Sequence, residues 1–352
     1  MKHLNLLLVL VACAFMLAGC RQKPVLHVYT WSDYISPDVV ADFEKEFGCQ
    51  VQLDIYDSNE MMFAKLQAGG GGYDVIVPSN YFIKKMAAEN MIVKLDKGRL
   101  PNLTHLDQNV VGKLDAAIMD YGVPYFMSYT GIGYNKQKLP DFDPTWNVFK
   151  RTDLKGYMTL LDDYSEVIGA AMLTLGYKTA DLTDPVNGDA RLNEVLKLLL
   201  EWRHNVIKFE NEQYKNGLAA GEFQVVMGYS MDIGQIVGED PEKLAFVMPR
   251  EGCLMSCDMM VISAKAPSPD LAYDFINYLH RPEVAARNIT DVLACCPNQD
   301  AMSLLDEEVR NNSSLFIAPE IIANSEFVVE LTPEQEQRYL NIWNKVKAGD
   351  GN

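Results

Sequence analysis

The feature that most constrains the fold of this sequence is an alternation of strand and helix patterns that begins at residue 25. Alternating β-forming side chains predict strands at 25–30, 51–55 and 74–77. Helices are predicted from 36 to 48 and from 58 to 66, the first opened by a Ser-Pro pair and closed by a glycine. Strand, helix, strand, helix and strand within about fifty residues is typical of an α/β fold with a parallel sheet.

The same alternation returns further along the chain. Short strands are predicted at 131–134, 158–161, 223–227, 244–247 and 259–262. Helices are predicted at 166–175, 190–205, 269–279 and 333–346. A chain of 352 residues is long enough for two domains, and no long linker separates the two α/β units. We therefore expect two lobes packed against each other, with a pocket between them or at the carboxyl ends of strands.

The charge balance narrows the classes of function. The sequence carries 31 Lys and Arg against 48 Asp and Glu, which gives a net charge of −17. Nucleic-acid binding needs clustered basic side chains on phosphates, so this acidity argues against a nucleic-acid partner. The acidity is compatible with a cationic ligand, although many acidic proteins are simply soluble.

The first twenty residues have the pattern of an export signal. A basic start precedes an almost unbroken apolar stretch at 4–17, which is too short to span a membrane. The sequence Leu17-Ala18-Gly19-Cys20 resembles the lipobox of bacterial lipoproteins. That resemblance implies a signal peptide at 1–19, a lipid on Cys20 and a tether at 20–24. The protein would then be exported to the periplasm or cell surface and anchored by its lipid to a bacterial membrane. The alternatives are an ordinary signal peptide with a chance cysteine, or a single membrane anchor.

Five cysteines follow Cys20, at positions 49, 253, 257, 295 and 296. Because five is odd, at least one is free or pairs with another chain, and the sequence leaves the pairing open. No metal is expected, since no histidine lies near these cysteines in the sequence. No enzyme activity is expected either, because the nucleophile elbow of hydrolases and the His-Glu-x-x-His motif are both missing.

Polar and aromatic side chains recur where the predicted strands meet helices. Such places gather ligand contacts, because helix-start N–H groups and projecting side chains converge there. The candidates are Trp31, Ser32, Asp33, Tyr34, Ser79, Tyr81, Asp163, Glu166, Tyr229, Asp232 and Asp258.

Each candidate also has an ordinary structural interpretation. The aromatic side chains fit a buried core, and a single aspartate in a loop is usually solvated. Asp163 followed three residues later by Glu166 approximates a capping box, which competes with a carboxylate pair that faces a cation. From position alone, both interpretations stay open.

Taken together, these residues resemble those of the polyamine-binding proteins of bacterial ABC importers, the spermidine/putrescine-binding family. The resemblance covers nearly the whole chain after the signal, and Trp-Ser-Asp-Tyr at 31–34 is nearer to the putrescine branch. The segments that carry it are 28–34, 57–60, 73–79, 130–135 and 281–284.

The resemblance implies an α/β, two-lobed class II periplasmic-binding-protein fold with the ligand cleft between the lobes. We expect lobe 1 to comprise 25–130 and 259–300, and lobe 2 to comprise 131–258 and 301–352. The hinge is expected near 129–134 and 257–262. We expect a monomer without a cofactor.

The resemblance also implies a role for each candidate. Trp31, Ser32, Asp33 and Tyr34 match a wall of the first lobe, while Ser79 and Tyr81 match its second loop. Asp163 and Glu166 match an acidic helix start, Asp232 a carboxylate of the putrescine branch, and Asp258 the amine-binding aspartate of the family.

Three positions depart from the family pattern. Tyr229 falls where the family usually has Trp, and Ser256 where it often has Trp or Phe. Leu293-Ala294-Cys295 lacks a Tyr that some members have. The resemblance therefore implies a smaller aromatic box than usual, which leaves the length and identity of the ligand open.

The expected function is binding of putrescine or spermidine outside the cytoplasm and delivery to an ABC permease with separate ATPase subunits. Carboxylates neutralise the ammonium groups, aromatic faces cover the methylenes, and closure of the lobes follows from contacts with both. The alternatives are a receptor for another cationic or amine-bearing solute, motivated by Ser256 and Ala294, and a sensory solute-binding subunit.

Overall fold

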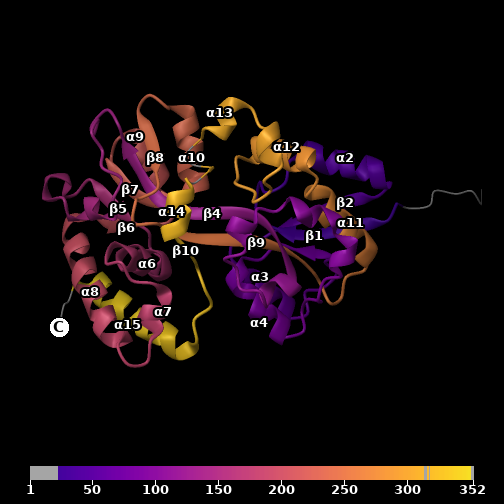
Figure 1. Ribbon diagram of the computed structural model, residues 1–352, viewed down its shortest axis with the longest axis horizontal. Coiled ribbons are helices and arrows are strands. Elements are labelled where there is room, and N and C mark those ends of the chain that lie inside the picture. Colours follow the sequence, from indigo (N-terminus) through magenta and orange to yellow (C-terminus); the bar gives the residue numbers. More distant parts are fainter. Residues whose placement is uncertain (1–22, 313–314, 317, 350–352) are drawn as a thin grey trace, which may run out of the picture.

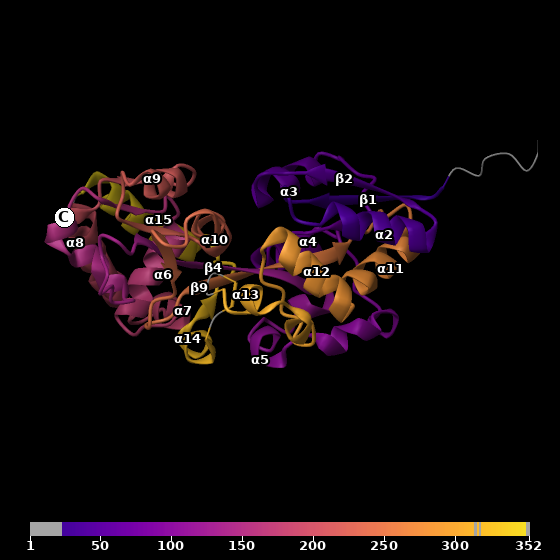
Figure 2. The ribbon, with the colours of Figure 1, turned by 90° about the horizontal axis from the view of Figure 1, so that it is seen from above.

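The computed structural model describes residues 23–312, 315–316 and 318–349. The predicted signal peptide and Cys20 lie outside these residues. The chain forms two α/β lobes that lie side by side and are joined by long strands (Figures 1 and 2). In the described part of the chain, no helix has the length and apolar character needed to cross a membrane.

Lobe 1, on the right in Figure 1, contains the first predicted strand–helix alternation. β1 (Val25–Thr30) lies between β2 (Gln50–Ile55) and β3 (Val75–Ile76), and both pairings are parallel. Its helices are α2 (Pro37–Phe47), α3 (Asn59–Gln67), α4 (Ile83–Ala88), α5 (Gln108–Val111), α11 (Pro269–Leu279) and α12 (Pro282–Val292).

Lobe 2, on the left in Figure 1, has a second sheet in which β5 lies between β6 and β7 and pairs with both in parallel. Its strands are β5 (Met158–Leu160), β6 (Lys208–Phe209), β7 (Val225–Tyr229) and β8 (Leu244–Val247). Its helices are α6 (Tyr164–Thr174), α7 (Thr179–Thr183), α8 (Gly188–Asn205), α9 (Tyr214–Ala220), α10 (Ser230–Glu239) and α15 (Pro333–Ala348).

Two long strands connect the lobes. β4 (Gly122–Asn135) pairs with β9 (Leu254–Ile262) up to Tyr129 and with β7 from Thr130 onward. The strand therefore changes partner between these two residues, so it belongs to the sheets of both lobes. The sequence predicted only the short stretches 131–134 and 259–262 of these strands.

The C-terminal part of the chain passes along this connection. β10 (Glu326–Phe327) pairs with the start of β9, and α15 then packs against α6 and α8 of lobe 2. The remaining α-helices are α13 (Glu307–Arg310) and α14 (Pro319–Asn324). The 3₁₀ helices are η1 (Asn80–Phe82), η2 (Lys97–Arg99), η3 (Pro101–His105), η4 (Ile118–Asp120), η5 (Trp146–Lys150), η6 (Thr152–Leu154) and η7 (Ala301–Leu304).

The ends of α2 show how the local sequence sets a helix. Pro37 occupies the first turn, and Gly48 closes the helix with a φ of 65°, a left-handed conformation that glycine adopts without strain. Ser36 is at the N-cap position, but its hydroxyl does not cap the helix. It donates instead to Oδ2 of Asp291 on α12 at 2.5 Å, so a tertiary contact has replaced the predicted local one.

Candidate functional site

Asp258 on β9 is one of two predicted carboxylates that are buried, the other being Glu166. It is 7% exposed, and it accepts hydrogen bonds from the hydroxyls of Tyr34 and Ser79, the latter at 2.5 Å. Tyr34 follows β1 and Ser79 follows β3, which are parallel neighbours. Ser79 also forms an antiparallel bridge with Asp258. The carboxyl ends of two lobe 1 strands therefore meet at one carboxylate.

The charge of Asp258 has no cationic partner in the described structure. Burial raises the pKa of Asp258 to about 6, while the hydrogen bonds from Ser79 and Tyr34 act in the opposite direction. Hydroxyl donors stabilise a carboxylate less than a counter-charge does, so the rise in pKa caused by burial is larger than the decrease caused by the two hydrogen bonds. The position is suited to a cation that arrives from outside.

Aromatic rings surround this carboxylate on lobe 1. The ring of Trp31 lies 4.5 Å from that of Tyr56, and both side chains donate to the carbonyl oxygen of Val77, at 2.9 and 2.5 Å. Burial and the charge of Asp258 raise the pKa values of Tyr56 and Tyr81, which keeps both hydroxyls protonated. Tyr56 was missed in the sequence, although it directly follows a predicted strand and the rule that found Trp31 also selects it.

A second carboxylate pair lies at the start of α6 in lobe 2. Asp163 is the N-cap and accepts from the backbone N–H groups of Ser165 and Glu166, at 2.8 and 3.2 Å. The side chain of Glu166 does not complete a capping box. It is 7% exposed and accepts from the hydroxyl of Thr130 on β4. The capping interpretation is therefore correct for Asp163 and wrong for Glu166.

Within the described ranges, no cationic side chain pairs with Asp163 or Glu166. Burial, followed by the charge of Asp163, raises the pKa of Glu166 to about 8. Burial is the main cause that raises the pKa of Asp163, and its backbone hydrogen bonds oppose it. A carboxyl group that is buried beside a second carboxylate favours its protonated form until a cation compensates the charge.

The two clusters lie close to each other along β4, which joins the lobes, because Asp258 is paired with Phe126 and Glu166 accepts from Thr130, four residues further along. The hydroxyl of Tyr229 lies 3.5 Å from Oδ2 of Asp163, and Tyr229 interacts electrostatically with Tyr81 of lobe 1. We call Asp258, Asp163, Glu166 and the tyrosines around them the interlobe site.

Three predicted residues are held by other contacts. Ser32 and Asp33 are exposed and hydrogen-bonded to each other at 3.1 Å, with Asp33 in a left-handed conformation at a φ of 52°. Asp232 accepts from the hydroxyl of Tyr214 at 2.5 Å and lies 3.6 Å from the ammonium of Lys215. Unlike Asp163 and Asp258, this carboxylate already has a counter-charge in the protein.

One buried amide was also missed in the sequence. Asn59 begins α3, and its side-chain N–H group lies 3.0 Å from the hydroxyl of Ser79 and 3.1 Å from that of Tyr81. Asn59 thereby fixes two predicted residues relative to each other. A polar residue at a helix start is common, so its position alone did not single it out, although the segment 57–60 was among those that carry the family resemblance.

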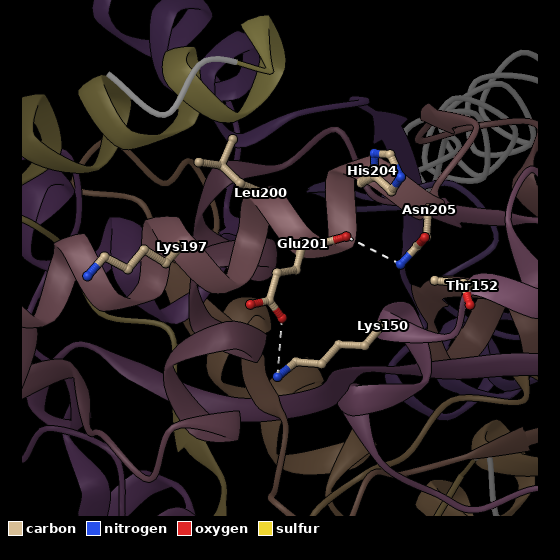
Figure 3. A pocket seen from close by; sticks show the side chains of 7 residues that line it. All are labelled: Lys150, Thr152, Lys197, Leu200, Glu201, His204 and Asn205. Atoms are coloured by element: carbon tan, nitrogen blue, oxygen red, sulfur yellow. Dashed lines mark hydrogen bonds and ion pairs between the residues drawn. The ribbon is translucent and has the colours of Figure 1, made fainter.

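A hollow elsewhere on lobe 2 lacks these features. It lies between the end of α8 and the short helices η5 and η6 (Figure 3). Its lining residues are Lys150, Thr152, Lys197, Leu200, Glu201, His204 and Asn205. Its carboxylate, that of Glu201, is already paired with Lys150 at 3.4 Å, and it contains none of the predicted residues. The hollow is therefore not the site that the sequence predicts.

The cysteines form no disulfide among the described residues. Cys49, Cys253, Cys257, Cys295 and Cys296 are free thiols. Burial raises the pKa values of all five, which disfavours their thiolate forms at neutral pH. Among the residues that the structure covers, no group of three or more His, Cys, Asp or Glu is placed to hold a metal ion.

Comparisons with a family model and with known sequences agree on one family. The family described as bacterial extracellular solute-binding protein matches residues 38–316. The chain is 34% identical over 372 aligned positions to the putrescine-binding periplasmic protein SpuD of Pseudomonas aeruginosa, covering 99% of this chain and all of SpuD. It is 33% identical over 367 positions to the putrescine-binding periplasmic protein PotF of Escherichia coli, covering 97% of each.

Solved structures agree with the sequence comparison. The spermidine/putrescine ABC transporter substrate-binding protein PotD of Streptococcus pneumoniae matches with a TM-score of 0.87 and 28% identity, over 93% of this chain and 99% of PotD. The lipoprotein Tp0655 (TpPotD) of Treponema pallidum matches with a TM-score of 0.79 and 28% identity, over 92% and 99% of the two chains. The two-lobed chain therefore belongs to the family of bacterial extracellular solute-binding proteins.

Proposed function

We propose that this protein binds a polyamine, putrescine or spermidine, between its lobes and delivers it to an ABC import permease. The observation that carries the proposal is a buried carboxylate on each lobe, Asp258 on one and Glu166 beside the half-buried Asp163 on the other, none of them paired with a cation among the described residues. The names of the relatives SpuD, PotF and PotD, which refer to putrescine and spermidine, support the same ligand class.

The chemistry of the site matches a slender organic dication. Burying an unpaired ammonium is costly, and a carboxylate that already sits in the dry site removes this cost for both groups. Tyr34, Tyr81 and Tyr229 can cover methylenes and add cation–π attraction of about 0.5–2 kcal/mol for each ammonium. We retain all eleven candidates as ligand-binding residues, with Asp258, Asp163 and Glu166 as the principal counter-charges.

Closure of the lobes would complete the site. A ligand that contacts both lobes favours their closed arrangement by the contacts it makes only there. We propose that the chain bends near 129–134 and 257–262, which is supported by the change of partner of β4 after Tyr129. The change of partner of β4 also supports the predicted lobes, with 25–130 and 259–300 in lobe 1 and 131–258 and 301–352 in lobe 2.

We further propose that the protein works as a monomer, anchored to the membrane by a lipid on Cys20, with a permease and a separate ATPase as partners. The lipobox-like sequence at 17–20 supports the anchor. Labelling of cells with a palmitate analogue, compared between the natural protein and Cys20→Ser, tests this part separately, because the anchor predicts label only on the natural protein.

A second ligand class has a specific observation in its favour. Ser256 and Ala294 stand where the family resemblance leads one to expect aromatic rings, and Ala294 is fully buried. A smaller aromatic box would admit an amine with a bulkier chain, such as one carrying a guanidinium or carboxyl group.

Native mass spectrometry and calorimetry on residues 21–352 test the proposed function. We expect the purified protein to carry, or to bind with a Kd below about 10 μM, 1,4-diaminobutane or spermidine. Amino acids of similar length serve as controls, because their carboxylates would meet the acidic site. Binding of such an amino acid, with none of either polyamine, would contradict the proposal and favour the second ligand class.

A further inference from the structure

Asp232 differs from Asp163 and Asp258, because a cation of the protein already lies beside it. It belongs to the first turn of α10, which directly follows β7. The ammonium of Lys215, in the first turn of α9, lies 3.6 Å from Oδ1 of Asp232. The hydroxyl of the buried Tyr214 donates to Oδ2 at 2.5 Å. Both oxygens of this carboxylate therefore have a partner within the protein.

The ion pair of Lys215 and Asp232 lies next to the interlobe site. Figure 2 shows α10 on the side of lobe 2 that is nearest to lobe 1, with α9 next to it. The hydroxyl of Tyr214, which binds Asp232, also accepts from the backbone N–H group of Tyr229 at 3.3 Å. Tyr229 belongs to the interlobe site, since its hydroxyl lies 3.5 Å from Oδ2 of Asp163. The side chains of the ion pair are 31% and 35% exposed, so both are accessible from solvent and partly shielded from it.

We propose that Lys215 is a specificity-determining residue, whose ammonium compensates Asp232 and so makes the site favour a diamine over a triamine. This inference rests on the proposed function and adds to it a count of the charges on the ligand. Asp258 would pair with one ammonium of the ligand, and Asp163 with Glu166 would pair with the second. A third ammonium would find Asp232 already compensated.

The reasoning follows from simple electrostatics. A third ammonium brought beside Asp232 would also approach the ammonium of Lys215, and these like charges repel each other. A partly buried ammonium that finds no free carboxylate loses hydration without compensation. Without a cation at position 215, Asp232 would be held by Tyr214 alone and would be free to pair with the ligand. Lys215 therefore disfavours a triamine more than a diamine.

The test compares spermidine with 1,4-diaminobutane, which has one ammonium group fewer. Calorimetry gives the ratio of the two affinities for the natural protein, Lys215→Gln, Lys215→Arg, and a double variant that combines Lys215→Gln with Asp232→Asn. The control is Lys150→Gln. Lys150 also belongs to lobe 2 and forms an ion pair, with Glu201 at 3.4 Å, but it lines the hollow that contains none of the site residues.

We expect Lys215→Gln to raise the spermidine-to-diaminobutane affinity ratio about fivefold, the upper end of what one partly exposed charge pair contributes. Lys215→Arg and Lys150→Gln should keep most of the natural ratio. The double variant should lose the gain, because the freed carboxylate is gone. An unchanged ratio in Lys215→Gln, an equal rise in Lys150→Gln, or a gain that persists in the double variant would overturn the inference. If the natural protein binds neither amine, the proposed function itself is wrong, whatever the Lys215 variants do.

Discussion

The first prediction concerns Asp258. Its buried charge would serve the binding of a cation, but it lowers the free energy of unfolding of the protein without ligand. Burial holds its pKa at about 6, against an ordinary value of 3.8. At about 1.4 kcal/mol for each tenfold change in the ionisation constant, the charged form costs the empty protein about 3 kcal/mol. We therefore expect Asp258→Asn to stabilise the empty protein by up to this amount at pH 7.5.

The pH dependence of the stability gain shows whether it comes from the ionisation of Asp258. Because the folded-state pKa lies above the unfolded one, the folded protein binds more protons between about pH 4 and 6, and its stability falls as the pH rises through this window. Above pH 6 the penalty is fully present, and below pH 4 it vanishes, since both states are then protonated. The advantage of Asp258→Asn should grow from near zero at pH 4 to its full size above pH 6.

Thermal unfolding measures this effect. With an unfolding entropy of about 2.1 cal/mol/K per residue over 352 residues, a gain of about 3 kcal/mol in the free energy of unfolding raises the Tm by about 4 °C. At a hundred times its Kd, 1,4-diaminobutane should add about 2.7 kcal/mol to the natural protein and nothing to the variant. Asp141→Asn, which replaces an exposed carboxylate, is the control and should leave both values unchanged.

Two results would refute the reasoning. Loss of stability in Asp258→Asn at pH 7.5 would show that the hydrogen bonds from Tyr34 and Ser79 outweigh the burial of the charge. A gain that is as large at pH 4 as at pH 7.5 would show that the gain does not come from ionisation.

Two further predictions follow from the same structure. Since the pKa of Glu166 is raised to about 8, diamine binding at pH 7 should release up to about one proton and tighten as the pH rises from 6 to 8. Calorimetry in two buffers of different ionisation enthalpy measures the release, and equal heats in both would contradict it. Gly131→Ala should lower the free energy of unfolding in urea by about 1–3 kcal/mol, because the added methyl would lie 2.5 Å from the Phe246 ring and 2.9 Å from the Val247 carbonyl oxygen. An unchanged midpoint would show that β4 can move aside.

Much of the fold follows from local patterns. The strands at 25–30 and 244–247 and the helices that begin at Pro269 and Pro333 were predicted at their observed positions. Alternation, caps and proline act over a few residues, so they can be read along the chain. β4 and β9 were predicted too short, because their length depends on pairing with strands that are distant in sequence.

The sequence identified the residues of the site better than their roles. Strand ends pointed to Trp31 and Ser79, since the carboxyl ends of neighbouring strands meet at one edge of a sheet. Asp258 was expected just before a strand, and it lies inside β9 (Leu254–Ile262). The same rule treated Asp232 and Asp258 alike. Only the structure shows that Lys215 already neutralises the first, while the second is buried without a cation.

By itself, the amino-acid sequence determined the α/β class, the acidity and the kinds of side chain at each strand end, since these depend on neighbours along the chain. The tertiary structure alone decided which carboxylates are buried and which one already has a counter-charge. The reason is physical: burial and charge pairing depend on distances between different segments of the chain, and folding sets those distances through the packing of the whole chain.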